Sequence, residues 1–152
     1  MGVRESLGRD HQAIERRLTE LSDAVEGADW PTILEVFRRV DRGLRAHIDG
    51  EEKYLFPRFE AGHSDVIRQL RRDHEHTRRA LDELMVQTEL HTLRKEPIDE
   101  LVAQLRSHAD KENGTLYAWA DETLIDEPEN GLFAFLEERR MSLREDQPGE
   151  SA

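Results

Sequence analysis

The sequence predicts an all-α protein: an up-down antiparallel four-helix bundle with a short additional C-terminal helix. Apolar residues recur at three- and four-residue intervals through four long segments, which is the period of an amphipathic helix. The turns between these segments are short, and short turns favour antiparallel neighbours. Charged residues make up 37% of the 152 residues and aromatic residues only 6%, which suits charged helix surfaces better than a sandwich or barrel.

The first two expected helices meet at a turn near residue 27. The buried face of the first consists of Leu7, His11, Ile14, Leu18, Leu21 and Val25. Gly27 is expected to end this helix, and Asp29 with Pro31 to begin the next. The buried face of the second consists of Phe37, Val40, Leu44, His47, Glu51 and Tyr54. Pro57 is expected to kink or end that helix, because proline lacks the backbone N–H.

The third and fourth expected helices follow turns at residues 62–64 and 91–97. The buried face of the third consists of Ile67, Leu70, His74, Thr77, Leu81 and Leu84. The buried face of the fourth consists of Ile98, Leu101, Leu105, His108, Glu112, Thr115 and Trp119. We expect each of these segments to form one continuous helix.

The chain is expected to comprise three parts. Residues 1–125 form the bundle, and residues 126–144 form a short helix that packs on the bundle or on a partner. Residues 145–152 form a solvated, disordered tail. The sequence leaves open whether the protein is a monomer or a homodimer.

Charge and composition exclude several classes of function. The net charge of −12 disfavours binding to nucleic acid or to an anionic membrane. The chain contains no cysteine, which excludes disulfides, thiolate metal sites and cysteine nucleophiles. No signal peptide or long apolar segment is present, so we expect a cytoplasmic protein.

Six polar residues occupy positions that should face the core of the bundle. We call them the polar layer: His11, His47, Glu51, His74, His108 and Glu112. In each HxxxE pair the glutamate follows the histidine by four residues, so both side chains project from the same helix face. The number of residues between each turn and the polar residues on either side of it is similar. The polar residues of all four helices should therefore lie at the same level of the bundle, within roughly one helical turn.

This set of side chains predicts a metal site. Two ionised glutamates buried at one level would repel each other, and a cation between them removes that cost. Imidazole with carboxylate suits iron, manganese or zinc. Six ligands are too many for one tetrahedral zinc ion but suit two ions, each held by two histidines and bridged by both glutamates.

Other interpretations apply to single residues. A lone core histidine such as His11 is more often a hydrogen-bonded core residue than a ligand, and His76 is a reserve ligand only. Tyr54 lies on the same predicted face as Glu51, so we expect it near the metals, either as a hydrogen-bond donor or as a phenolate ligand. Thr77 and Thr115 either line a cavity or bond backbone carbonyls. A metal-free interaction bundle, with the polar layer paired internally, is a third interpretation.

The combined motif resembles the hemerythrin-like proteins, the HHE cation-binding domain family. The matching segments are DHQAI, HIDGEEKYLFP, RDHEH and HADKENGTLYAW, in the pattern H…HxxxE…H…HxxxE. The resemblance implies a non-haem di-iron centre, with two iron ions bridged by an oxo or hydroxo group. The implied ligands are the six residues of the polar layer.

The chain departs from the oxygen-carrying hemerythrins at two positions. Those proteins have a second histidine four residues after the one on the third helix, where this chain has Arg78. They also have an aspartate five residues after the last histidine, where this chain has Asn113. Four histidines in place of five make reversible oxygen carriage a poor expectation.

The expected function is therefore chemistry on small molecules. A di-iron centre of this kind is expected to bind and react with hydrogen peroxide, nitric oxide or oxygen in oxidative or nitrosative stress defence. The alternative is a non-enzymatic protein that binds or senses oxygen, nitric oxide or iron. The sequence does not distinguish iron from manganese, and it leaves open whether the protein is an enzyme.

Overall fold

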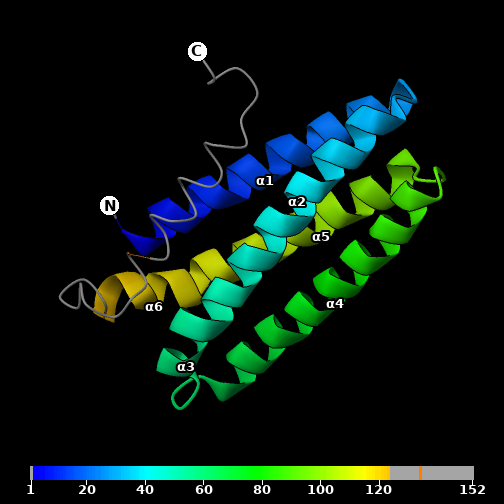
Figure 1. Cartoon of the computed structure of the whole chain (residues 1–152). Helices are drawn as coiled ribbons and strands as arrows, with labels where there is room; N and C mark the ends of the chain where they lie inside the picture. The colour runs from blue at the N-terminus through cyan, green and yellow to red at the C-terminus, as the bar shows by residue number, and fades with distance from the viewer. Residues whose placement is uncertain (1, 124–133, 135–152) are drawn as a thin grey trace.

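The computed structural model describes residues 2–123 and residue 134, and the described elements are all helical. Four long helices form the body: α1 (Val3–Glu26), α2 (Trp30–Gly50), α4 (Ser64–Glu89) and α5 (Lys95–Gly114). They contact one another in a ring, α1 beside α2 and α5, and α4 beside α2 and α5 (Figure 1). Consecutive helices run in opposite directions, so the predicted antiparallel four-helix bundle is confirmed.

The turn between α1 and α2 forms as the sequence predicts. Gly27 caps α1, although the residue with positive φ is Ala28, at 51°. The side chain of Asp29 caps α2 by accepting hydrogen bonds from the backbone N–H of Thr32 at 3.4 Å and from its hydroxyl at 2.6 Å. This arrangement satisfies donors that a helix N-terminus otherwise leaves without partners.

The second predicted helix is interrupted at its glutamate. One turn of π-helix, η1 (Glu51–Leu55), follows α2 directly, and a short helix α3 (Phe56–Phe59) follows η1. Pro57 lies in the first turn of α3, where its missing N–H is tolerated. The expected interruption near Pro57 is therefore confirmed, and it takes the form of a wide turn that changes which residues after Glu51 face the core.

The fourth predicted helix is not continuous, and this expectation was wrong. Helix α5 ends at Gly114, and α6 (Leu116–Thr123) begins after Thr115, whose φ and ψ are −130° and −90°. Glycine is a poor helix former, so the chain can break there at little cost. The break redirects the first turn of α6 relative to α5.

Two apolar clusters fill the bundle. The larger one lies toward the α1–α2 turn and includes Leu18, Phe37 and Leu81. The smaller one lies toward α3 and α6 and includes Leu7 and Phe56. Along α1 and α4, the polar layer falls between residues of the larger cluster and those of the smaller one. The residues of α2 and α5 in these clusters belong to the larger one, and the smaller cluster continues in the segments that follow them, η1, α3 and α6.

Two expectations concern parts of the chain beyond these elements. The predicted C-terminal helix at 126–144 and the tail at 145–152 lie outside the described residues, apart from residue 134, and stay predictions. In the described part of the chain, no helix combines the length and the apolar character needed to cross a membrane.

Candidate metal centre

The structure brings all six side chains of the polar layer together. Their ligand atoms form two groups, and within each group the atoms all lie within 4.8 Å of one another. The first group consists of His11, His47, Glu51 and Glu112. The second consists of Glu51, His74, His108 and Glu112. The two glutamates therefore belong to both groups, which is the arrangement that two bridged ions require.

The first group joins α1 to α2. Nε2 of His11 lies 2.9 Å from Nε2 of His47. Nε2 of His47 is 3.4 Å from Oε1 of Glu51, and Nε2 of His11 is 3.6 Å from Oε1 of Glu112. The side chain of His11 is 21% exposed, whereas those of its three partners are almost completely buried. Solvent therefore approaches the polar layer most closely at His11.

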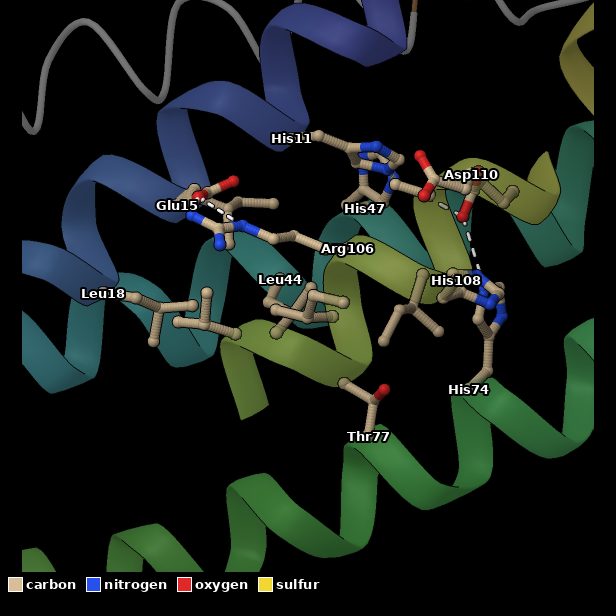
Figure 2. A pocket seen from close by; sticks show the side chains of 16 residues that line it. His11, Glu15, Leu18, Leu44, His47, His74, Thr77, Arg106, His108 and Asp110 are labelled. Atoms are coloured by element: carbon tan, nitrogen blue, oxygen red, sulfur yellow. Dashed lines mark hydrogen bonds and ion pairs between the residues drawn. The ribbon is translucent and has the colours of Figure 1, made fainter. Parts of the chain in front are cut away.

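The second group joins α4 to α5. Nε2 of His74 is 3.3 Å from Oε1 of Glu51 and 3.9 Å from Oε2 of Glu112. Nε2 of His108 is 3.2 Å from Oε1 of Glu112. The two imidazole rings lie with their centroids 4.9 Å apart (Figure 2). Both histidines thus present the same nitrogen toward the glutamates.

Three of the four histidines contact a second carboxylate through the other ring nitrogen. Nδ1 of His47 is 3.4 Å from Asp10, that of His74 is 2.7 Å from Glu52, and that of His108 is 2.8 Å from Asp73. A carboxylate at Nδ1 holds the proton on that nitrogen and leaves Nε2 free to bind a metal. These carboxylates are residues that sequence reasoning missed.

A cation lies behind two of these outer carboxylates. A guanidinium nitrogen of Arg78 is 3.0 Å from Glu52 and another is 2.9 Å from Asp49. The ammonium of Lys111 is 3.1 Å from Asp73. Arg78 stands where the oxygen carriers have a further histidine, and its side chain here is directed at acidic groups of α2 and η1.

Several buried atoms of the polar layer make no hydrogen bond in the described structure. They are Oε1 of Glu51, Oε2 of Glu112 and Nε2 of His74 and of His108. A buried polar atom left in this state destabilises a fold by about 1–3 kcal/mol. Four such atoms close together are expected in a site whose side chains bind cations. The residues present therefore fit metal binding.

The pKa values of the two central glutamates are shifted in opposite directions. Burial raises the pKa of Glu112 well above its usual value, and the neighbouring charge of Glu51 raises it further. Burial also acts to raise the pKa of Glu51, but His47 and His74 outweigh it and hold that pKa well below its usual value. Without a metal, the pair carries one negative charge and one proton, as close carboxylates do.

The histidines also differ in charge. Burial and the neighbouring His47 lower the pKa of His11 to about 3. Burial lowers the pKa of His74 as well, but Glu51 and Glu52 outweigh it and raise the value to about 9. His11 is therefore neutral near pH 7 and already in the form that binds a metal, whereas His74 must first lose a proton.

Tyr117 is a site residue that sequence reasoning missed. Its buried hydroxyl donates a hydrogen bond to Oε2 of Glu51 at 2.5 Å and lies 3.0 Å from Oε1 of Glu112. It also lies 3.1 Å from Nε2 of His11. Because a hydroxyl carries one proton, the contact with Glu112 suits a protonated carboxyl that donates in return, in agreement with its raised pKa.

The position that matches Tyr117 in the other HxxxE segment is Phe56. Both residues follow their glutamate by five positions, and both come just after an irregular turn. Phe56 stacks on the ring of His74, with centroids 5.0 Å apart. The two halves of the polar layer therefore differ in one hydroxyl group, which faces the glutamates from the side of α6.

The remaining sequence-predicted residues lie as follows. Tyr54 is half-buried against the smaller apolar cluster, and its expected role beside the metals stays a prediction. The hydroxyls of Thr77 and Thr115 both donate to backbone carbonyls, at 3.0 Å and 2.7 Å, and Thr77 also lines a cavity. His76, the reserve ligand, is exposed.

A cavity of about 300 Å³ adjoins the polar layer. Five residues of the polar layer line one end, and the rest of the lining is mostly aliphatic, with Glu15, Thr77, Arg106 and Asp110 among it (Figure 2). Glu15 of α1 and Arg106 of α5 also line the cavity, and Nε of Arg106 donates a hydrogen bond to Glu15 at 2.8 Å. Both side chains are exposed to solvent, so a small molecule can approach the polar layer past them.

Comparison with known proteins identifies one family. The family model described as the hemerythrin HHE cation binding domain matches residues 3–120. The match spans every residue of the polar layer and Tyr117. No curated protein and no solved structure matched the chain.

Proposed function

The chain belongs to the hemerythrin HHE cation-binding family, and from that premise we propose that its polar layer holds two iron ions and reacts with small oxidants. The observation that carries this proposal is the set of buried, unsatisfied nitrogen and oxygen atoms that face one another at the centre of the bundle. Their donor types match those of carboxylate-bridged di-iron proteins.

The proposed ligands divide between the two groups described above. His11 and His47 would hold one ion, and His74 and His108 the other. Glu51 and Glu112 would bridge both ions, since each glutamate belongs to both groups. Arg78 is occupied by carboxylates, which supports two histidines per ion rather than a fifth histidine ligand.

The surrounding residues would prepare the site for redox chemistry. A bound di-iron pair supplies Lewis acidity and one-electron redox steps to a peroxide or a diatomic molecule. The outer carboxylates keep each Nε2 directed at the centre, and the two apolar clusters keep bulk water away from both sides. Access remains at the partly exposed His11 and through the adjoining cavity.

Tyr117 would act as a hydrogen-bond donor at the bridging carboxylates. Its proton is firmly held, because burial and the charges of Glu112 and Glu51 raise the pKa of the phenol well above its usual value. A neutral phenol that donates to Glu51 withdraws electron density from that bridge. Tyr117 would thereby make the His11 side of the centre different from the His74 side.

The substrates we propose are hydrogen peroxide, nitric oxide or oxygen, handled in oxidative or nitrosative stress defence. Disproportionation of hydrogen peroxide fits best, because it yields water and oxygen without an outside electron donor. Departures from the oxygen carriers at Arg78 and Asn113 also favour reaction over reversible carriage.

Oxygen evolution from hydrogen peroxide tests this proposal. Iron-loaded protein should evolve oxygen faster than the same amount of free iron, and the double variant Glu51→Gln/Glu112→Gln should not. Consumption of nitric oxide, followed with an electrode, is the parallel assay. If the loaded protein matches free iron in both assays, the proposed chemistry is wrong.

A second candidate function is non-enzymatic binding or sensing of oxygen, nitric oxide or iron. The unsatisfied atoms favour it as well, because a core that stays polar without metal couples metal binding to folding. This function predicts slow peroxide turnover together with a large structural response to iron. Circular dichroism with and without a chelator measures that response, and an unchanged spectrum and melting curve would exclude an iron sensor.

A further inference from the structure

The cavity beside the polar layer is larger than the proposed small oxidants need. Its volume is about 300 Å³. Two ions and their bridging atoms would occupy roughly 100 Å³ if each takes about the volume of a water molecule, ~30 Å³. Roughly 200 Å³ then remains, and a cavity of about 150 Å³ is known to hold benzene. Hydrogen peroxide or nitric oxide would fill only a small part of this space.

The walls of the cavity are mostly apolar away from the polar layer. Six aliphatic side chains form most of them: Ile14, Leu18, Leu44, Ile48, Val102 and Leu105. Thr77, Ala109 and Asp110 complete the lining. Ile14, Leu18, Leu44 and Ile48 are at most 4% exposed, so these walls are part of the core. Water in such a chamber finds few hydrogen-bond partners, whereas a hydrocarbon group gains dispersion contacts and leaves solvent.

Polar groups lie at the two ends of the cavity. At the inner end are histidines of the polar layer and Glu51. At the outer end Arg106 and Glu15 bridge α5 and α1, with side chains 66% and 39% exposed (Figure 2). Because both partners are exposed to solvent, this ion pair is weak and can open to admit a molecule.

We propose that this cavity binds an organic molecule with a compact hydrocarbon body and one oxygen-donor head group, the class formed by alkyl and aryl hydroperoxides and their alcohols. The head group faces the polar layer and the body lies against the aliphatic walls. A body of about six to ten non-hydrogen atoms fits the remaining volume. The orientation of the head rests on the proposed metal centre, while the fit of the body rests on the cavity alone. Binding is proposed here, with no bond made or broken.

The probe that tests this site is 2-phenylpropan-2-ol, a stable aryl alcohol of the proposed size. Isothermal titration calorimetry on the metal-loaded full chain should detect binding of one molecule per chain, and the probe should raise the melting temperature. Val102→Phe should weaken binding by about tenfold or more, because the added ring takes up space that the body of the ligand needs. If Val102→Phe does not fold, Ala109→Leu, a substitution at another residue that lines the cavity, replaces it.

The matched control is Ala103→Phe, which adds the same ring to an exposed position of α5. It should leave the affinity within about twofold of the parent chain. The proposal is overturned if the parent chain gives neither heat nor a melting shift up to the solubility limit of the probe. It is equally overturned if Val102→Phe folds and binds as tightly as the parent.

Metal content and peroxide turnover, measured on the same samples, separate this site from the proposed function. Val102→Phe should keep its iron content, because Val102 is not one of the six proposed ligands, and turnover is judged on the parent chain alone. A protein that binds the probe but neither retains iron nor turns over peroxide would refute the proposed function and keep the site. A protein that retains iron and turns over peroxide but does not bind the probe would refute the site alone.

Discussion

A single hydroxyl group distinguishes the two halves of the polar layer. Tyr117 contacts both central glutamates, while Phe56 at the matching position stacks on His74. A regular helix would turn a residue five positions after Glu112 about 140° away from it. The break at Thr115 brings Tyr117 back to the glutamates, and this explains why regular periodicity did not indicate it.

Substitution of Tyr117 should separate stability from metal retention. Tyr117→Phe removes the donor to Glu51 and should lower the free energy of unfolding by about 1–2 kcal/mol. It should leave the ligand set intact, so iron content should not fall. Urea unfolding measures the free energy of unfolding, and the absorption spectrum of the iron-loaded protein shows whether the iron is retained.

Tyr54→Phe is the matched control for that substitution. Tyr54 is half-buried against the smaller apolar cluster, so loss of its hydroxyl should leave the spectrum unchanged. A spectral change in Tyr54→Phe with none in Tyr117→Phe would assign the role at the metals to Tyr54 instead.

Metal uptake should release protons. The pKa of about 9 for His74 means that this residue is protonated near pH 7 in the metal-free chain, and the raised pKa of Glu112 favours its protonated form as well. Both residues must be deprotonated to bind a metal, so at least one proton should leave at pH 7. Apparent affinity should therefore rise with pH up to about 9. Calorimetry in buffers of different ionisation enthalpy counts the protons, and uptake that releases none would contradict this protonation pattern.

At the scale of the elements, neighbouring segments orient one another's histidines. Asp10 of α1 contacts His47 of α2, Glu52 of η1 contacts His74 of α4, and Asp73 of α4 contacts His108 of α5. Each imidazole is thereby held from a different helix. The alignment of Nε2 atoms then depends on the packing of the whole ring of helices.

Removal of one outer carboxylate should weaken the centre without removing a ligand. Asp73→Asn abolishes the charge that faces Nδ1 of His108 and should lower metal affinity by about 10–100-fold. Competition with a chromophoric chelator measures this change. Asp99→Asn, at an exposed position on α5, the helix that carries His108, is the control and should have no effect. Equal affinities in both variants would show that Asp73 does not support the site.

Much of the element structure follows from apolar periodicity, and the exceptions occur beside the glutamates. Spacing of three and four residues located the four helices, and the HxxxE pairs indicated that His47, Glu51, His108 and Glu112 would meet. The irregular turns at 51–55 and at Thr115 depart from a regular helix, so a fixed helical period cannot indicate which of the residues after them face the core. The outer carboxylates were missed because acidic residues are abundant on helix surfaces, and only a folded chain shows which of them face a histidine.

At the scale of the whole molecule, the polar layer divides the core. The larger apolar cluster lies on one side and the smaller cluster on the other. A fold with a buried polar layer between two apolar clusters is stable only if that layer is satisfied. The cavity is also a whole-molecule feature, because its walls come from α1, α2, α4 and α5, and sequence spacing gave no indication of its volume.

Chelation should destabilise the entire bundle. If free metal exceeds its dissociation constant about a thousandfold, its removal lowers the free energy of unfolding by about 4 kcal/mol. For a chain of this length, that corresponds to a fall in melting temperature of roughly 10 °C. Scanning calorimetry with and without chelator measures it. The double variant Glu51→Gln/Glu112→Gln should melt at the same temperature in both conditions, and an equal shift in that variant would assign the effect to metal elsewhere.

The metal content of each chain, measured by mass spectrometry on protein produced in iron-sufficient cells, tests the central claim most directly. The polar layer predicts close to two iron ions per chain, and a clear loss of iron in Glu112→Gln, because that glutamate belongs to both ligand groups. A folded parent chain with little or no metal would contradict the account. The buried histidines and glutamates would then be a polar core that pairs internally, and the bundle would have to act without a metal.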